Sequence, residues 1–431
     1  MTNFQIGIIG VFAVLAVIGV LAFAGVGGFG QDADEIGKIE IWGTIPNDTV
    51  DQLLEAVKDA DDSFSGVKYI EKDINTYQKE FVEALAVGAG PDLFLLGHDG
   101  IVRNQDKVIE VPYKSFSERD FKNTFIEEGE IYLTATGSLG MPFTVDPLVM
   151  YWNRNIFQNV GIANPPKFWD ELFVLSPKIT QRDSASNIIR SFTALGEFNN
   201  IENAKDILSA FIIQSGNPIV TASENGLESV LDERFGFASS PAESAIRFYT
   251  EFSNPIKSVY SWNRSLPNSK QLFTAGDLAI YFGFASELPD IIRANPNLNF
   301  DISALPQLRD SDTRITYGHM NALSISRSSR NPSGAFAVAL ALTSAGSNAL
   351  FSNLSGLPPV RRDLLAIEQT DAIASVLYDS AIISKAWLDP STVDSRSIFK
   401  NMIESVTSGR ASLNDAVDTA NDELNLLLNS R

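Results

Sequence analysis

Apolar and polar positions follow a regular order over the segment that begins near residue 38. Ile39 and Ile41 lie on one face of a short run that predicts a strand over 38–42. Apolar residues at helical spacing predict helices over 50–57 and 77–85, and apolar runs predict strands over 67–70 and 93–96. This strand–helix alternation predicts a parallel sheet with right-handed crossovers. Ligands of such sheets lie beyond the carboxyl ends of the strands.

The rest of the chain gives a coarser pattern. It predicts a strand over 142–152, a mostly helical stretch over 166–294, a further strand over 315–326 and helices after that. A chain of 431 residues exceeds one compact core and predicts two domains. No linear boundary separates them, which indicates that the chain crosses between the domains more than once.

The N-terminus carries a continuous apolar run, Ile6–Ala24, interrupted only by glycines. About 19 helical residues span roughly 28 Å, close to the thickness of a bilayer core. The run could be a cleaved signal peptide, since Ala22-Phe23-Ala24 resembles a cleavage site. We favour a retained transmembrane anchor over 6–24, with a linker over 25–37 and the large domain on the extracytoplasmic side.

Composition narrows the function classes. The apolar fraction of 44% is that of a globular protein, and the formal charge of −20 argues against nucleic acid as a partner. The chain has no cysteine, which excludes disulfides, thiolate metal sites and a cysteine nucleophile. It also excludes attachment to a membrane through an acylated cysteine.

Four local motifs occur in a fixed order: Gly-Pro-Asp-Leu at 90–93 leading to Asp99, Gly-Met-Pro-Phe-Thr-Val-Asp at 140–146, Pro-Pro-Lys-Phe-Trp-Asp-Glu-Leu at 165–172, and Phe-Thr-Ala-Gly-Asp-Leu-Ala-Ile at 273–280. Together they resemble the extracellular solute-binding proteins of ABC importers, family 1, the group that includes the maltose-binding protein. The resemblance covers nearly everything after the linker. Phe168 departs from it where the family has a threonine, and Gly100 where the maltose-binding protein has an arginine.

The resemblance implies a two-lobed, periplasmic-binding-protein-like α/β fold with three interlobe crossings, placed near Asp146, Tyr317 and Phe351. Lobe 1 would comprise 38–145 and 318–350, and lobe 2 would comprise 146–317 and 351–431. The implied function is capture of a small polar ligand, such as a sugar, by lobe closure. The partners would be the permease subunits of an ABC importer, and the protein would be a monomer without cofactor.

Two carboxylates lead the candidate ligand-binding residues. Asp99 follows the predicted third strand and offers two acceptors for vicinal hydroxyls, although His-Asp-Gly also suits a plain turn. Asp146 matches a ligand-binding glutamate of the maltose-binding protein and could instead be structural at the crossing. Thr44, at the carboxyl end of the first strand, and Glu197, near the family's second-lobe ligand loop, complete the polar set.

Aromatic and imidazole side chains form the second group. Sugar-binding clefts place aromatic faces against the apolar faces of sugar rings, although most of the 28 phenylalanines must be core residues. This group consists of Tyr281 and Phe284, and of Tyr317 and His319 at the second crossing, where the amide of Asn321 is a further candidate. A zinc site between His98 and His319 would need further ligands, so no metal is predicted.

Two other function classes stay open. A glycoside hydrolase needs two carboxylates about 5–10 Å apart, and Asp99, Asp146 and Glu197 could converge in that way. The sequence contains neither a G-x-S-x-G elbow nor a P-loop, so we predict that the protein is not an enzyme. A sensory or adhesive binding module would share the fold and lack the importer.

Overall fold

A computed structural model describes residues 36–224, 226–309 and 311–430. The expected anchor over 6–24 and all but the last two residues of the expected linker lie outside the described residues. Within those described ranges, no single helix is both long and apolar enough to cross a membrane. One bent pair, Pro332–Leu342 with Ala345–Ser355, meets the length and composition test jointly, with an angle of 65° at the break.

The chain divides into two compact units. Of the described residues, unit 1 contains those between 36 and 145 together with His319–Glu368, and unit 2 contains those between 146 and 318 together with those between 369 and 430. The first boundary lies inside strand β7 (Met141–Asn153) and the second inside strand β14 (Thr316–Ser326).

The third boundary differs from the expected position near Phe351. Helix α13 (Ala345–Ser355) runs through Phe351, whose ring lies 4.7 Å from that of Phe143. Beyond the helix, the Val360 amide donates to Asn348 Oδ1 at 3.0 Å. These contacts keep residues 351–368 in unit 1, and the change of unit comes only after Glu368.

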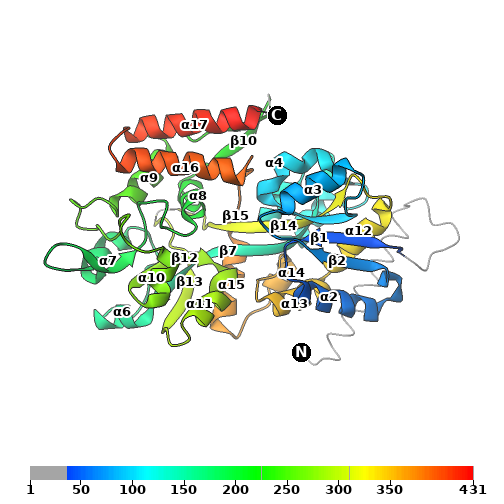
Figure 1. The fold of residues 1–431 in the computed structure, drawn as a ribbon, viewed down its shortest axis with the longest axis horizontal. Helices are drawn as coiled ribbons and strands as arrows, with labels where there is room; N and C mark the ends of the chain where they lie inside the picture. The colour runs from blue at the N-terminus through cyan, green and yellow to red at the C-terminus, as the bar shows by residue number, and fades with distance from the viewer. Residues whose placement is uncertain (1–35, 225, 310, 431) are drawn as a thin grey trace. The chain divides into compact units, whose positions relative to one another are not determined.

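Unit 1 is built on the predicted parallel strands β1 (Ile39–Gly43), β2 (Val67–Glu71) and β3 (Leu93–Gly97) (Figure 1). Their order is β2-β1-β3, and β14 continues the sheet antiparallel to β3. The predicted helices are present as α2 (Asn47–Ala60) and α3 (Tyr77–Ala86). Helix α2 buries its apolar stripe, as its periodicity predicts, through Val50, Leu53, Leu54 and Val57.

The remaining elements of unit 1 are short helices, 3₁₀ turns and strand pairs. They are η1 (Asp62–Phe64), η2 (His98–Gly100), α4 (Ile101–Asn104), η3 (Gln105–Lys107), β4 (Val108–Ile109), β5 (Val111–Pro112), α5 (Glu118–Thr124), η4 (Glu127–Tyr132), β6 (Gly137–Ser138), α12 (Pro332–Leu342) and α14 (Arg362–Leu365).

Unit 2 contributes further strands, which the sequence analysis missed in part. Strand β7 lies between β13 (Phe300–Ala304) and β12 (Leu278–Phe284), and β12 pairs in parallel with β9 (Ile188–Thr193). The expectation of a mostly helical stretch over 166–294 was therefore wrong for β9 and β12. All seven residues of β12 are buried, so the strand shows none of the alternation that would have identified it.

The remaining elements of unit 2 are mainly helices. They are α6 (Arg154–Asn159), α7 (Glu171–Ile179), β8 (Gln181–Arg182), α8 (Ala204–Gln214), β10 (Val220–Ser223), β11 (Gly226–Ser229), α9 (Pro241–Glu251), α10 (Ser269–Ala275), η5 (Ala285–Glu287), α11 (Leu288–Ala294), α15 (Ala372–Ile382), β15 (Ser384–Lys385), α16 (Thr392–Thr407) and α17 (Leu413–Asn429).

Candidate functional site

Polar side chains gather in unit 1 where the parallel strands end. Thr44 follows β1 and is half-buried, and Asp99 follows β3 in the turn η2. A methyl group built on Gly97 would lie 2.5 Å from Asp99 Oδ1, so the glycine leaves room for the carboxylate to fold back over the strand end. The position after β3 is the one that the parallel-sheet rule predicts for ligand contacts.

Strand β14 brings a second predicted residue to the same place. Asn321 is paired with Gly97 in the sheet. Its Oδ1 would lie 3.4 Å from the methyl group built on Gly97. Its Nδ2 donates to Thr144 Oγ1 at 3.1 Å. Sequence reasoning missed Thr144, for which the available signal was a hydroxyl within an otherwise apolar run. Asp99, Asn321 and Thr144 therefore form one polar cluster, called the unit 1 cluster below.

The two histidines lie beside this cluster. Their rings are 5.3 Å apart, His98 is buried, and the Met320 amide donates to His98 Nδ1 at 3.4 Å. Within the part of the chain that the structure describes, no group of three or more His, Asp or Glu side chains is placed to hold a metal ion.

Tyr132 lies beneath the strand ends. Its hydroxyl is 2.8 Å from the Leu96 carbonyl oxygen and 2.9 Å from that of Met320, which links β3 to β14. Burial raises the pKa of Tyr132 well above its usual value, and the negative charges of Asp99 and Glu128 raise it further. Tyr132 is therefore a neutral hydrogen-bond donor that fixes the base of the cluster.

Asp146 is the first residue of unit 2, and the loop after β12 holds its side chain. The Ser286 amide donates to Asp146 Oδ1 at 3.0 Å. Asp146 is half-buried, and the bond leaves it with a defined orientation.

The structure places the predicted aromatic residues in the core of unit 2. Tyr281 is 1% exposed and its hydroxyl donates to Glu287 Oε2 at 2.6 Å. Phe284 and Tyr317 are also buried. Consecutive positions of β12 are buried on both faces, so no face of this strand presents an aromatic ring to solvent.

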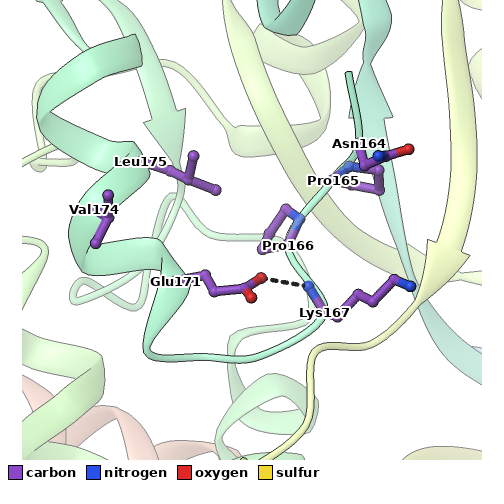
Figure 2. A pocket seen from close by; sticks show the side chains of 7 residues that line it. All are labelled: Asn164, Pro165, Pro166, Lys167, Glu171, Val174 and Leu175. Carbon is purple, nitrogen blue, oxygen red and sulfur yellow. Dashed lines mark hydrogen bonds between the residues drawn. The ribbon is translucent and has the colours of Figure 1, made fainter. Parts of the chain in front are cut away.

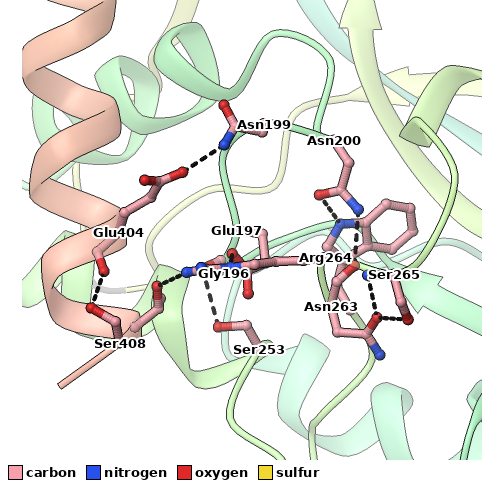
Figure 3. Close-up of polar contacts among 12 residues, drawn as sticks. Gly196, Glu197, Asn199, Asn200, Ser253, Asn263, Arg264, Ser265, Glu404 and Ser408 are labelled. Carbon is pink, nitrogen blue, oxygen red and sulfur yellow. Dashed lines mark hydrogen bonds and ion pairs between the residues drawn. The ribbon is translucent and has the colours of Figure 1, made fainter.

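Glu197 belongs to a polar network within unit 2. It is 8% exposed, its Oε2 accepts from Arg264 Nε at 2.8 Å, and its carbonyl oxygen accepts from the Tyr249 hydroxyl at 2.6 Å. Burial raises the pKa of Glu197, Arg264 opposes that rise, and Glu404 adds to it. Figure 3 shows the network between the loop after β9 and α16. Glu197 therefore has a structural partner, which weakens its case as a ligand contact.

A separate hollow of about 400 Å³ lies in unit 2 (Figure 2). It contains none of the predicted site residues, and Lys167 is tied to Glu171 beside it by a 2.8 Å bond from its amide. The hollow is lined by Asn164, Pro165, Pro166, Lys167, Glu171, Val174 and Leu175.

Curated relatives are binding proteins. A protein of Brucella abortus (strain 2308), named only as a binding protein, is 23% identical over 291 residues. The match covers 65% of this chain and 64% of the Brucella protein, so the chain spans less than two thirds of that relative. The sn-glycerol-3-phosphate-binding periplasmic protein of Rhizobium meliloti (strain 1021) is 27% identical over 175 residues, 39% of this chain and 36% of its own length.

Solved structures share the fold. An ABC transporter solute-binding protein of Thermotoga lettingae, bound with α-D-tagatose, matches with a TM-score of 0.63 and 20% identity over 91% of this chain and 100% of its own. The cyclic α-maltosyl-1,6-maltose-binding protein of Arthrobacter globiformis matches with a TM-score of 0.73 and 14% identity over 91% and 99%. The expected two-lobed, periplasmic-binding-protein-like fold is thereby confirmed.

The sequence itself identifies the family. Residues 52–375, about three quarters of the chain, match the family described as bacterial extracellular solute-binding protein. This agrees with the order of the four motifs and with the fold. The chain is therefore a member of the bacterial extracellular solute-binding protein family.

Proposed function

We propose that this protein captures a sugar or oligosaccharide by closing its two units around it and delivers the ligand to an ABC importer. The observation that carries the proposal is the unit 1 cluster, in which Asp99, Asn321 and Thr144 meet at the carboxyl ends of the parallel strands. A carboxylate, an amide and a hydroxyl together match the alternating donors and acceptors of vicinal hydroxyl groups.

The cluster itself favours an uncharged ligand, since it joins one carboxylate to two neutral groups. The lysine that follows β2, Lys72, is bound to Glu80 at 3.1 Å and lies 3.7 Å over the Trp42 ring. An anionic ligand such as sn-glycerol-3-phosphate, which the Rhizobium relative binds, would call for arginine or lysine at the site. It is the second candidate ligand.

The remaining parts of the proposal follow the family. The protein would bind its ligand without catalysing a reaction. In unit 1 the binding residues would be Thr44, Asp99 and Asn321, with His319 beside them. In unit 2 the binding residue would be Asp146. The segment 6–24 would hold the protein at the extracytoplasmic side of the membrane as a monomer. Genes for two permease subunits next to this one would favour transport over a sensory or adhesive role.

Thermal-shift titration of the full-length protein tests the ligand class. The panel would contain D-tagatose, maltose, maltotetraose, mannotriose and sn-glycerol-3-phosphate, in a detergent without a sugar head group. A ligand that binds only the folded protein stabilises it by about 2.7 kcal/mol at 100 times Kd. We expect saturable stabilisation by at least one sugar, lost in Asp99→Asn.

The matched control is Asp106→Asn, which removes an exposed carboxylate that lies in the same unit and pairs with Lys107. It should bind like the unmodified protein. If sn-glycerol-3-phosphate stabilised the protein and no sugar did, the ligand would be an anion and the sugar assignment would be wrong. Steady release of reducing sugar from an oligosaccharide, abolished in Asp99→Asn, would overturn the assignment as a binding protein.

A further inference from the structure

One carboxylate in unit 2 collects an unusual number of donors. Glu287 Oε1 accepts from Asn203 Nδ2 at 2.7 Å and from the Phe284 amide at 2.9 Å. Its Oε2 accepts from the Tyr281 hydroxyl at 2.6 Å and lies 2.9 Å from Lys270 Nζ. Side-chain exposure is 12% for Glu287, so these bonds form away from bulk water, where charge-assisted hydrogen bonds are strong.

The backbone is arranged to let Glu287 fold back over its own loop. The bond to the Phe284 amide is the return half of a capping box, in which the third residue of a helical turn binds the amide that precedes it. A methyl group on Gly283 would lie 2.9 Å from Glu287 Oε1 and 2.5 Å from Tyr281 Cε1. The missing side chain of Gly283 therefore leaves room for the Glu287 carboxylate and for the Tyr281 ring.

The loop that Glu287 holds is the loop that binds Asp146. Ser286, the residue before Glu287, donates its amide to Asp146 Oδ1 at 3.0 Å. The carbonyl oxygen of Phe284 accepts from the Tyr151 hydroxyl at 2.7 Å, which ties the same loop to β7, the strand of Asp146. The direction of the Ser286 amide is thus fixed on both sides by contacts of residues 284 and 287.

We propose that Glu287 is a positioning residue that orients the Asp146 carboxylate through the amide of Ser286. This inference rests on the proposed function, in which Asp146 is the ligand contact of unit 2. One donor belongs to the cap residue of α8, one to α10 and two to β12, where they are the Tyr281 hydroxyl and the Phe284 amide. Because they converge on one carboxylate, its loss would free the loop without removing any part of the hydrophobic core.

Glu287→Gln tests this with little change of shape. One oxygen is kept, while the new amide group cannot accept from Tyr281 or Lys270. Asp290→Asn is the matched control, because Asp290 is an exposed carboxylate that also approaches Lys270, at 3.9 Å, and lies in α11. Lys270→Gln removes one positive charge beside Glu287 and shortens the side chain, and it serves as a milder variant if Glu287→Gln folds poorly.

The first measurement needs no ligand. Amide hydrogen exchange at Ser286 in the full-length protein should become at least about 10-fold faster in Glu287→Gln, because residue 287 loses its bonds to Tyr281 and Lys270 and the loop opens locally more often. Asp146→Asn, which weakens the acceptor, should also accelerate it, and Asp290→Asn should leave it unchanged. An unchanged rate at Ser286 in Glu287→Gln and in Lys270→Gln would overturn the proposal.

The second measurement is a double-mutant cycle on the Kd of the panel sugar that stabilises the protein most. Glu287→Gln alone should weaken binding about 10-fold. In the Asp146→Asn background it should weaken binding less than about 2-fold, because both changes act through one contact. Full additivity would show that Glu287 does not act through Asp146. If no panel sugar binds while the Ser286 exchange responds as expected, the ligand class fails and the positioning of Asp146 stands.

Discussion

At the scale of single residues, the missing side chain of Gly97 decides where the Asp99 carboxylate can lie. Gly97→Ala would place a methyl group 2.5 Å from Asp99 Oδ1 and 3.4 Å from Asn321 Oδ1. The φ of −69° at Gly97 suits any residue, so the backbone is not strained by the change. We expect about 10-fold weaker sugar binding, by titration calorimetry. The melting temperature should change little, because the clash is with the end of a side chain that can rotate away.

Gly100→Ala is the control for this prediction. Its methyl group would meet Leu96 Cδ1 at 3.3 Å and Asn104 Nδ2 at 3.4 Å, and it should leave sugar binding unchanged. If Gly97→Ala bound sugar as tightly as the unmodified protein, the observed position of Asp99 would have no role in binding.

At the scale of elements, a buried ion pair joins α8 to the segment that precedes α16. Lys205 Nζ contacts Asp389 Oδ2 and donates to Ser395 Oγ at 3.1 Å, and both charged side chains are almost fully buried. Lys205→Met would leave the Asp389 charge uncompensated, which costs about 3–5 kcal/mol of unfolding free energy. Urea denaturation of the full-length protein measures this loss.

Two variants make the comparison specific. Lys257→Met breaks an ion pair with Glu251 in which the lysine is 49% exposed, and it should cost less than about 1 kcal/mol. Adding Asp389→Leu to Lys205→Met removes the unpaired charge and should recover much of the loss. A cost for Lys205→Met no larger than that for Lys257→Met would contradict the role of the pair.

The same scale shows what the sequence could predict. Helix α2 was predictable because only one of its faces is buried, which leaves a period in the order of apolar residues, and strand β1 because the polar Glu40 separates Ile39 from Ile41. Strand β12 is buried throughout and carries no such period, so its existence and the core position of Tyr281 were missed together. The meeting of Asn321 with Gly97 depends on the register of strands far apart in the chain, which local patterns do not encode.

At the scale of the whole molecule, the chain passes from one unit to the other at three places. The proposed closure would occur about these three places. Two of them lie inside the continuous strands β7 and β14, and the third follows Glu368. A ligand favours closure only as far as it binds the closed form more tightly than the open one. Contacts to Asp99 in one unit and Asp146 in the other would supply that difference.

The absence of cysteine from the sequence makes this closure directly measurable. Ile74→Cys in unit 1 and Ile256→Cys in unit 2 replace side chains that are 76% and 92% exposed, so spin labels can be attached there without disturbing the core. Pulsed electron–electron double resonance measures the distance between the two spin labels. At saturating sugar, the distribution of this distance should be different and narrower than without sugar. A second pair within unit 2, Ile256→Cys with Val393→Cys, should give the same distribution with and without sugar. If the pair across the units stayed unchanged while calorimetry recorded binding, the ligand would be held by one unit alone, and Asp146 would not be part of the site.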